Sequence, residues 1–384
     1  MSSPLKYMPI FRVRTQETQV LKSFDFGDRI YPCLEIVKEL DQVNSKKKKD
    51  AQISLFGQKS EKNFESVYIP LIRSIKADKV FIDLPVHLPQ SRNTKPPTLL
   101  FLRTVVKNRE KRTEYLKKLK PVSSKIIPVI STYLQISGEG DSISLQEKEM
   151  RDDFETLAFR TFVETFAQDI EQIKKSIKPN DFIIMDFENN DLDEADDDIQ
   201  DIVQEFKNLN CNIIIHRNQI SEDVTMTGLN HGSMIDKIDN SLPFIFKEFA
   251  GHCFSDYVGI KKDNITEGGG ISPGFLFYDA VTNNFFGFRY KYGGHKKGET
   301  KPELIEFETT IVPAVISSNS SKRMQSDSSD YLGAGNKGWE IITNIERGEY
   351  NGGESGKSAA KFKRISMEHY LHCIRIKISN GDFD

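Results

Sequence analysis

Carboxylates end several of the hydrophobic runs in the first two thirds of the chain, where they are placed to bind a divalent cation. Glu35 ends YPCLE, Asp83 ends VFID, and Asp186 and Glu188 end FIIMDFE. Carboxylate oxygens suit Mg²⁺ and Mn²⁺, and a bound ion can polarise a phosphoryl oxygen and activate water. Asp186 and Glu188 are two apart, so on a strand both face the same side. We therefore predict Asp186, Glu188 and Glu35 as ligands of Mg²⁺ or Mn²⁺, and Asp83 as a catalytic residue.

Basic side chains end other runs of the same kind. Arg12 and Arg14 close PIFRVR, Arg160 lies in LAFRTF, and His216 and Arg217 close NIIIHR. Guanidinium groups bind phosphate and carboxylate through two parallel hydrogen bonds, so we predict that Arg12, Arg14 and Arg160 bind substrate. Histidine transfers protons near neutral pH. Because His216 and Arg217 are adjacent they point to opposite faces, and we predict His216 as the inward, catalytic one.

The run SDYVGI adds two further candidates. Asp256 is a candidate base or ligand and Tyr257 a candidate group for holding a substrate oxygen. The two alternate along the chain, so only one of them faces any given side of a strand. A structural interpretation stays open for all of these residues, in which the acids cap helices or neutralise the arginines.

The spacing of the hydrophobic runs predicts the elements that carry these residues. Strands are expected near residues 7–13, 30–36, 79–84, 125–130, 157–162, 182–187, 212–216 and 255–260. Helical segments are expected near residues 17–24, 64–75, 99–119, 164–177 and 233–249, with another after the acidic run at 191–198. This alternation predicts an α/β fold, a (β/α)₈ TIM-like barrel, in which the carboxyl ends of the strands share one mouth.

The alternation of strand and helix patterns ends after residue 265, where the turn-rich stretch GGGISPG follows. We predict a barrel over residues 1–265 and a C-terminal α+β extension over 266–384 that packs on it. The extension should hold a hairpin turning at 281–284, a mobile Ser-rich loop at 317–330, and a final helix over 367–376 capped by Ser366.

Composition excludes several classes of protein. The 384 residues carry a net charge of −3, which argues against a broad basic surface for nucleic acid, although the polar insert at 41–62 holds Lys46–Lys49. The chain has four cysteines and no CxxC pair, no signal peptide and no apolar run long enough to span a bilayer, so we predict a cytoplasmic protein with no membrane partner. NGGESGKS at 351–358 lacks the glycine spacing of a phosphate-binding loop and is interpreted as a flexible loop.

Several short blocks together resemble one family. YMPIFRVRTQE, IYPCLEI, FIDLP, FIIMDFE, HCFSDYVGI, FFGFRY and ISMEHYLHCI are similar to successive blocks of the phage beta-protein family. The resemblance implies a barrel-like fold and a setting in phage and bacteria, without a settled activity. Where the family pattern has paired histidines near its end, this chain has His369 and Tyr370, which weakens a metal site there.

Two hypotheses follow from these residues. The first is a metal-dependent hydrolase of a phosphate ester, nucleotide or nucleic acid that acts in phage–host conflict or antiviral defence. The second is a non-catalytic binding or scaffold protein that recognises a host or phage protein or senses a small anionic ligand.

Overall fold

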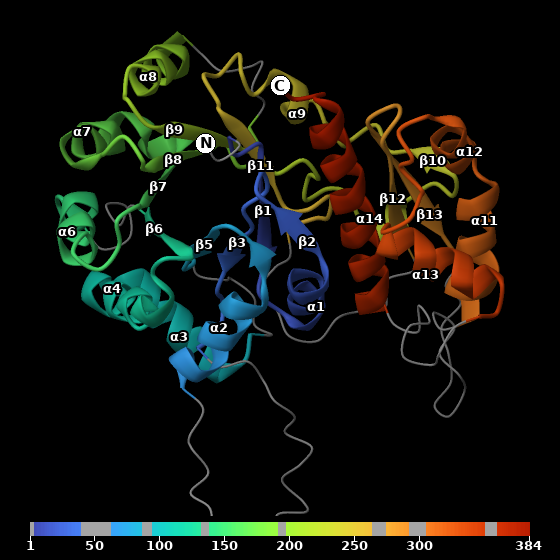
Figure 1. The fold of residues 1–384 in the computed structure, drawn as a ribbon, viewed down its shortest axis with the longest axis horizontal. Helices are drawn as coiled ribbons and strands as arrows, with labels where there is room; N and C mark the ends of the chain where they lie inside the picture. The colour runs from blue at the N-terminus through green and yellow to red at the C-terminus, as the bar shows by residue number, and fades with distance from the viewer. Residues whose placement is uncertain are drawn as a thin grey trace, which may run out of the picture.

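Eight parallel strands close into a barrel and follow one another around it in sequence order (Figure 1). The computed structural model describes residues 4–39, 63–86, 94–131, 138–190, 197–262, 274–291, 305–349 and 359–384. The predicted α/β barrel is therefore confirmed. Its strands are β1 (Tyr7–Arg12), β3 (Cys33–Glu35), β5 (Val80–Asp83), β6 (Ile126–Ser131), β7 (Ala158–Phe162), β8 (Phe182–Asp186), β9 (Asn212–His216) and β11 (Cys253–Asp256).

The two faces of each strand enter different cores. Inward residues such as Ile10, Phe81, Val129 and Ile184 fill the lumen as one cluster. Outward residues alternate with them and join the larger core beneath the surrounding helices. This period of two along each strand decides which polar residues at the strand ends face the lumen.

Helices cover the barrel between successive strands. They are α1 (Thr15–Ser23), α2 (Phe64–Ser74), α3 (Pro96–Lys107), α4 (Arg109–Lys117), α6 (Ser142–Met150), α7 (Phe166–Ser176) and α8 (Asp197–Lys207). The segment predicted as one helix over 99–119 is divided at Asn108, whose extended backbone (φ −135°) ends α3 and whose side chain accepts from the Lys111 N–H at 2.8 Å. A short parallel pair, β2 (Asp25–Gly27) and β4 (Lys76–Ala77), lies outside the barrel.

A C-terminal layer flanks the barrel instead of capping either end (Figure 1). Its sheet pairs β12 (Gly274–Asp279) with β13 (Asn284–Arg289), the predicted hairpin, and β13 with β10 (Ser233–Met234). The long helix α14 (Ala359–Asn380) lies between this sheet and the barrel, while α11 (Val312–Ser317), α12 (Asn319–Ser326) and α13 (Lys337–Glu346) complete the layer.

Three predicted segments differ in the structure. The helix expected over 233–249 is wrong: Ser233–Met234 form strand β10, and only the short helix α9 (Leu242–Ile245) follows. The segment 317–330 contains helix α12, because the Ser318 hydroxyl caps it by accepting from the Ser321 N–H at 3.1 Å. Ser366 lies inside α14 and donates to the carbonyl of Leu276 at 2.8 Å, so it is not a cap.

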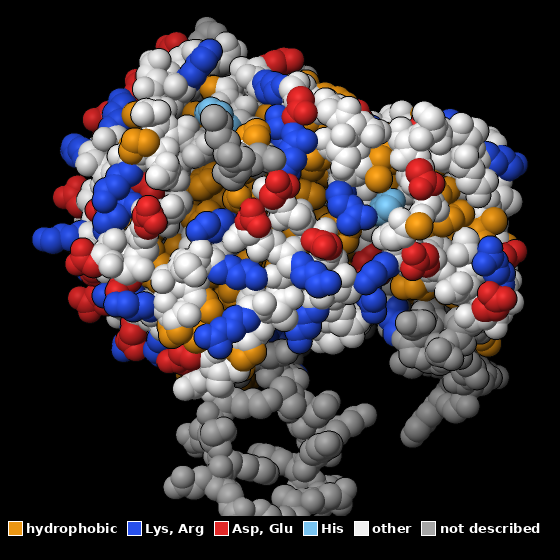
Figure 2. All heavy atoms as spheres, viewed as in Figure 1, with side chains coloured by type: hydrophobic (Ala, Val, Ile, Leu, Met, Phe, Trp, Pro, Cys, Tyr) orange, Lys and Arg blue, Asp and Glu red, His pale blue; other side chains and the backbone are white. Residues whose placement is uncertain are grey.

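The surface carries interspersed charges. In Figure 2, Lys and Arg side chains alternate with Asp and Glu over the face that is shown, as the small net charge of −3 suggests. None of the helices that the structure describes is long and apolar enough to cross a membrane. The segments 41–62, 191–196 and 351–358 lie outside the described residues, and so do the predictions that fall on them.

Candidate functional site at the carboxyl end of the barrel

The inward polar residues at the strand ends meet in the lumen. Register pairs Arg12 with Glu35, Glu35 with Asp83, and Asp186 with His216 on neighbouring strands. On each of these strands, the residue two positions earlier belongs to the apolar cluster in the lumen. The polar residue at the strand end therefore faces the lumen too. The structure therefore brings together Arg12, Glu35, Asp83, Arg160, Asp186 and His216, as their places at the strand ends predict.

Arg160 is the centre of this group. Its Nε and Nη2 donate to Asp186 Oδ2 at 2.9 and 2.6 Å, and its Nη1 donates to Asp83 Oδ2 at 2.6 Å. Glu35 Oε1 lies 3.6 Å from the same Nη1. Asp83 is on β5, two strands from β7, so this contact passes over the intervening strand β6. One buried guanidinium thus holds carboxylates from three different strands.

Two further arginines complete the ion pairs. Arg12 Nε donates to Glu35 Oε2, and Arg112 of helix α4 reaches Asp83 Oδ1 at 3.0 Å from outside the barrel. Arg112 is fully buried and also donates to the Pro85 carbonyl at 3.3 Å. We call these six residues the ion-pair network: Arg12, Arg112, Arg160, Glu35, Asp83 and Asp186. Three guanidinium groups face three carboxylates, so the network is neutral when all six are ionised.

The electrostatic balance differs among the three acids. Burial raises the pKa of Glu35 and Asp186, but for Glu35 the charges of Arg12 and Arg160 outweigh it, and for Asp186 those of His216 and Arg160 do, so both pKa values fall to about 2. Burial raises the pKa of Asp83 above its usual value despite Arg160 and Arg112. Glu35 and Asp186 are therefore firmly ionised at neutral pH.

The acids do not fit a Mg²⁺ or Mn²⁺ ion in this arrangement. Asp186 Oδ2 accepts two bonds from Arg160 and its Oδ1 accepts the Glu188 N–H at 2.9 Å. Both oxygens of Asp83 accept guanidinium bonds. Among the residues that the structure describes, no cluster of three or more His, Cys, Asp or Glu is arranged to hold a metal. A cation would have to displace Arg160, and we route no chemistry through one.

Beside the network lie two buried polar atoms without partners. His216 is fully buried, and its Nδ1 lies 3.0 Å from Ser255 Oγ. Its Nε2 has no hydrogen bond within the described chain, and the nearest carboxylate oxygen, Asp186 Oδ1, is 3.8 Å away. The Tyr257 ring packs against His216 with centroids 5.2 Å apart, and the buried Tyr257 hydroxyl likewise has no hydrogen-bond partner in the described part of the chain. Buried groups left in this state cost free energy unless something binds them.

Lys262 adds a charge that the network does not balance. Its ammonium nitrogen lies 5.4 Å from the centre of the Tyr257 ring, and no hydrogen bond or ion pair joins it to another described residue. Burial lowers the pKa of Lys262, but the negative charges of Tyr257 (when ionised), Asp186 and Glu35 raise it above its usual value. Lys262 is therefore a cation beside the two unpartnered atoms.

His216 is neutral at physiological pH. Burial lowers its pKa to about 4, and Arg160 adds to that effect while Asp186 opposes it. A neutral imidazole keeps one nitrogen as an acceptor and the other as a donor. With Nδ1 on Ser255, Nε2 is the atom available to exchange a proton with a guest or to bind it.

Three predicted site residues lie elsewhere. Asp256 points out of the barrel, because it alternates with Ser255 and Tyr257, and it accepts from Tyr7 and Tyr370 at 2.5 and 2.7 Å. Glu188 lies at the rim in a left-handed conformation (φ 50°), and Arg14 lies at the N-terminus of α1. The prediction that these three residues join the others in the lumen is therefore wrong. Asp256 faces outward because of the strand pleat, and Glu188 and Arg14 lie beyond the ends of their strands.

The sequence prediction omitted two contributors. Lys262 lies six residues beyond the end of β11, so it does not end a hydrophobic run as the other residues do. Arg112 comes from a helix, and its only signal is a basic residue four positions before the buried Leu116, on the inward face of α4. A positional search confined to strand ends cannot find it.

Comparison with known proteins gives one match. The family model described as Beta protein matches residues 7–375, nearly the whole chain. No curated protein and no solved structure matches this chain.

Proposed function

Since this chain belongs to the Beta protein family, which brings no assigned activity with it, we propose from the geometry of the lumen that the barrel mouth binds a small anionic ligand. Lys262, Tyr257 and His216 are the groups that we expect to contact it. Arg12, whose guanidinium carbon lies 5.8 Å from the Tyr257 ring centre, and Arg160, which lies in the adjoining network, are close to the same three groups.

The observation that carries the proposal is that Lys262 Nζ, the Tyr257 hydroxyl and His216 Nε2 have no hydrogen-bond partner among the described residues, beside a network that is neutral. An oxyanion such as phosphate or carboxylate would accept from the Lys262 ammonium, the Tyr257 hydroxyl and His216 Nε2. It would also balance the charge of Lys262, which the three carboxylates do not, because the arginines already engage them. Charge-assisted hydrogen bonds of this kind are the strong ones.

A titration with inorganic phosphate tests this site. Phosphate should raise the melting temperature saturably, and Lys262→Met should weaken its apparent affinity by about tenfold or more, the loss of one charge-assisted bond. Lys261→Met is the matched control, because the Lys261 ammonium turns away to the carbonyls of Glu222 and Val224. Equal affinity in Lys262→Met and the wild type would remove the assignment.

If the site is catalytic, we propose that it hydrolyses a phosphate ester, nucleotide or nucleic acid. A neutral His216 with a free Nε2 supports it, since such a group can accept or donate a proton. Turnover of p-nitrophenyl phosphate or nucleotides should then fall at least a hundredfold in His216→Gln, while phosphate binding falls far less. The phage–host setting rests on the family alone.

The alternative is a non-catalytic binding protein that recognises a host or phage protein. The saturation of the carboxylates by arginines favours it, because a neutral buried network is an ordinary way to stabilise a barrel interior. Retained phosphate binding without turnover of any ester, with or without added Mg²⁺ or Mn²⁺, would support this alternative over the hydrolase.

A further inference from the structure

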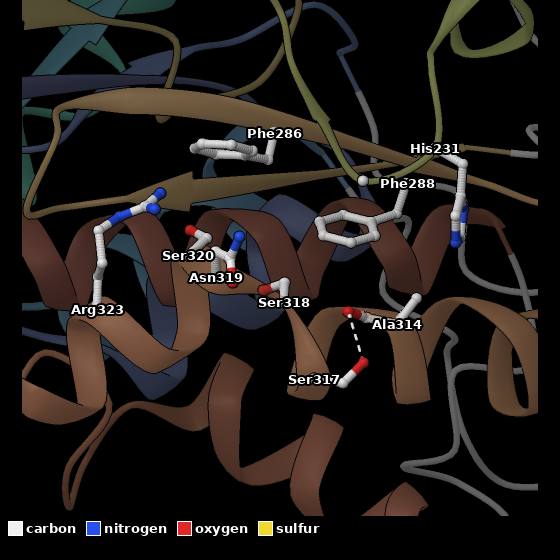
Figure 3. A pocket seen from close by; sticks show the side chains of 10 residues that line it. His231, Phe286, Phe288, Ala314, Ser317, Ser318, Asn319, Ser320 and Arg323 are labelled. Atoms are coloured by element: carbon white, nitrogen blue, oxygen red, sulfur yellow. Dashed lines mark hydrogen bonds between the residues drawn. The ribbon is translucent and has the colours of Figure 1, made fainter.

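We propose that the C-terminal layer carries a second small-molecule site, for a flat aromatic ring that bears an oxyanion. It is a groove of about 410 Å³ between strand β13 and helices α11 and α12, closed at one end by the loop before β10 (Figure 3). A volume of this size is in the range of small-molecule pockets. The groove shares no residue with the barrel mouth.

One wall of the groove is aromatic. Phe286 and Phe288 project from β13 over the helices, with His231 beside Phe288 at a ring separation of 5.8 Å (Figure 3). The Arg323 guanidinium lies 5.5 Å from the centre of the Phe286 ring at the other end. A planar ring can stack on such a wall at little cost in its own conformational freedom.

The facing wall is the N-terminus of helix α12. The Ser318 cap engages the N–H of Ser321, so the N–H groups of Asn319 and Ser320 precede the first hydrogen bonds inside the helix. Independently of the helix end, the Ser320 side chain lines the groove, is 1% exposed, and has no partner for its hydroxyl within the described residues. An oxyanion here would accept from all three groups.

The charge of the lining also favours an anion. Arg323 is held by two bonds to Asp279 Oδ2, at 2.9 and 2.5 Å from Nε and Nη2, which leaves Nη1 turned from that partner. Its side chain is 37% exposed, whereas Asp279 is fully buried behind it. No acidic residue is among the ten that line the groove. The anchored arginine thus presents a fixed positive group beside the helix end.

Calorimetry with adenosine 5′-monophosphate, adenosine and inorganic phosphate tests the site on the full chain. In Lys262→Met, where the barrel mouth is weakened, the nucleotide should bind the groove one-to-one and more tightly than either fragment, since only it engages both walls. Ser320→Ala should weaken binding by about tenfold without lowering the melting temperature, because it removes an unpartnered buried hydroxyl. Ser326→Ala is the matched control, as Ser326 does not line the groove and its hydroxyl donates to the Arg323 carbonyl of the same helix at 2.9 Å.

A second substitution, Ala314→Trp, tests whether the nucleotide binds in this groove. Ala314→Trp should fill the groove and abolish binding, while Lys262→Met, at the barrel mouth, should leave it unchanged. Nucleotide binding that persists in Ala314→Trp, or that is lost in Lys262→Met, would overturn the assignment to this groove. Failure of all three probes to bind would also overturn it.

Discussion

At the scale of single residues, the lumen shows how one guanidinium can order several strands. Arg160 engages Asp186 on the neighbouring strand and Asp83 on the next strand but one. Removing one partner of a buried ion pair leaves the others charged without compensation, which costs far more than the pair itself contributes. Arg160 is therefore first a structural residue, whatever ligand lies beside it.

Arg160→Met should lower the free energy of unfolding by about 3–5 kcal/mol, because it leaves Asp83 and Asp186 buried without their central donor. Urea denaturation measures the change. Lys174→Met is the control, since Lys174 pairs with Glu171 and Glu205 at the surface, where such pairs contribute little, and the substitution should leave the free energy of unfolding nearly unchanged. A similar small effect in both variants would contradict the central role of Arg160.

The buried histidine should make stability depend on pH in a defined direction. The pKa of His216 is about 4 in the folded protein, below the value of about 6.5 in an unfolded chain. The unfolded state therefore binds more protons between those values, so stability rises from pH 4 to pH 6.5.

His216→Gln should make that rise less steep when unfolding is measured at a series of pH values, while His369, whose pKa burial also lowers to about 4, still contributes to it. The exposed His231 provides the control as His231→Gln, which should keep the wild-type slope. An unaltered slope in His216→Gln would show that the imidazole is not buried in its neutral form.

At the scale of elements, helix α14 occupies the place outside β1 and β11 where the last helix of a barrel packs. Tyr370 of α14 donates to Asp256 of β11 at 2.7 Å, and Tyr7 of β1 donates to the same carboxylate at 2.5 Å. Gly259 permits the close approach: its φ is +63°, and a Cβ there would lie 2.5 Å from the Tyr370 ring. Burial raises the pKa of Asp256 to about 6 against these hydrogen bonds.

Tyr370→Phe should lower the free energy of unfolding by about 1.5–3 kcal/mol, because Asp256 loses one donor to a charged group in a buried site. Thermal melting and hydrogen exchange in α14 both report it. Tyr115→Phe is matched in chemistry but removes an exposed bond to Glu39, 2.9 Å long, and should change stability by less than about 0.5 kcal/mol. Equal effects of the two substitutions would argue against docking of α14 through this carboxylate.

At the scale of the whole molecule, the barrel and the C-terminal layer share one core. Apolar residues of α14 belong to the same buried cluster as those beneath the barrel helices. Strand β10, which lies between barrel strands β9 and β11 in sequence, pairs with β13 of the C-terminal sheet. The layer is thus joined to the barrel both by packing and by strand pairing.

Deletion of residues 359–384 should abolish cooperative unfolding, because it uncovers Tyr7, Asp256 and the apolar surface beneath α14. Circular dichroism melts and limited proteolysis measure this outcome. A truncated chain that melts in one sharp transition near the wild-type temperature would show instead that the barrel is independent of the layer.

The sequence determined the eight strands, their order and the polar residue at each end, because hydrophobic runs with a polar terminus are local patterns. Alternation along the strand also indicated that only one of His216 and Arg217 could face the lumen, and in the structure it is His216, two residues after the inward Ile214. The sequence did not determine that Asp256 faces α14. Which residue of SDY enters the lumen depends on where β11 begins and ends, and that is set by the structure.

Only the tertiary structure decided what the gathered residues do to one another. The saturation of the acids by Arg160 and Arg112 depends on distances between strands and from a helix outside the barrel, which no local spacing encodes. The same holds for 233–249, where pairing of β10 with a strand some fifty residues later overrides the helical pattern. Local patterns thus indicated most of the groups that enter the barrel, and long-range contacts decided which of them remain available to a ligand.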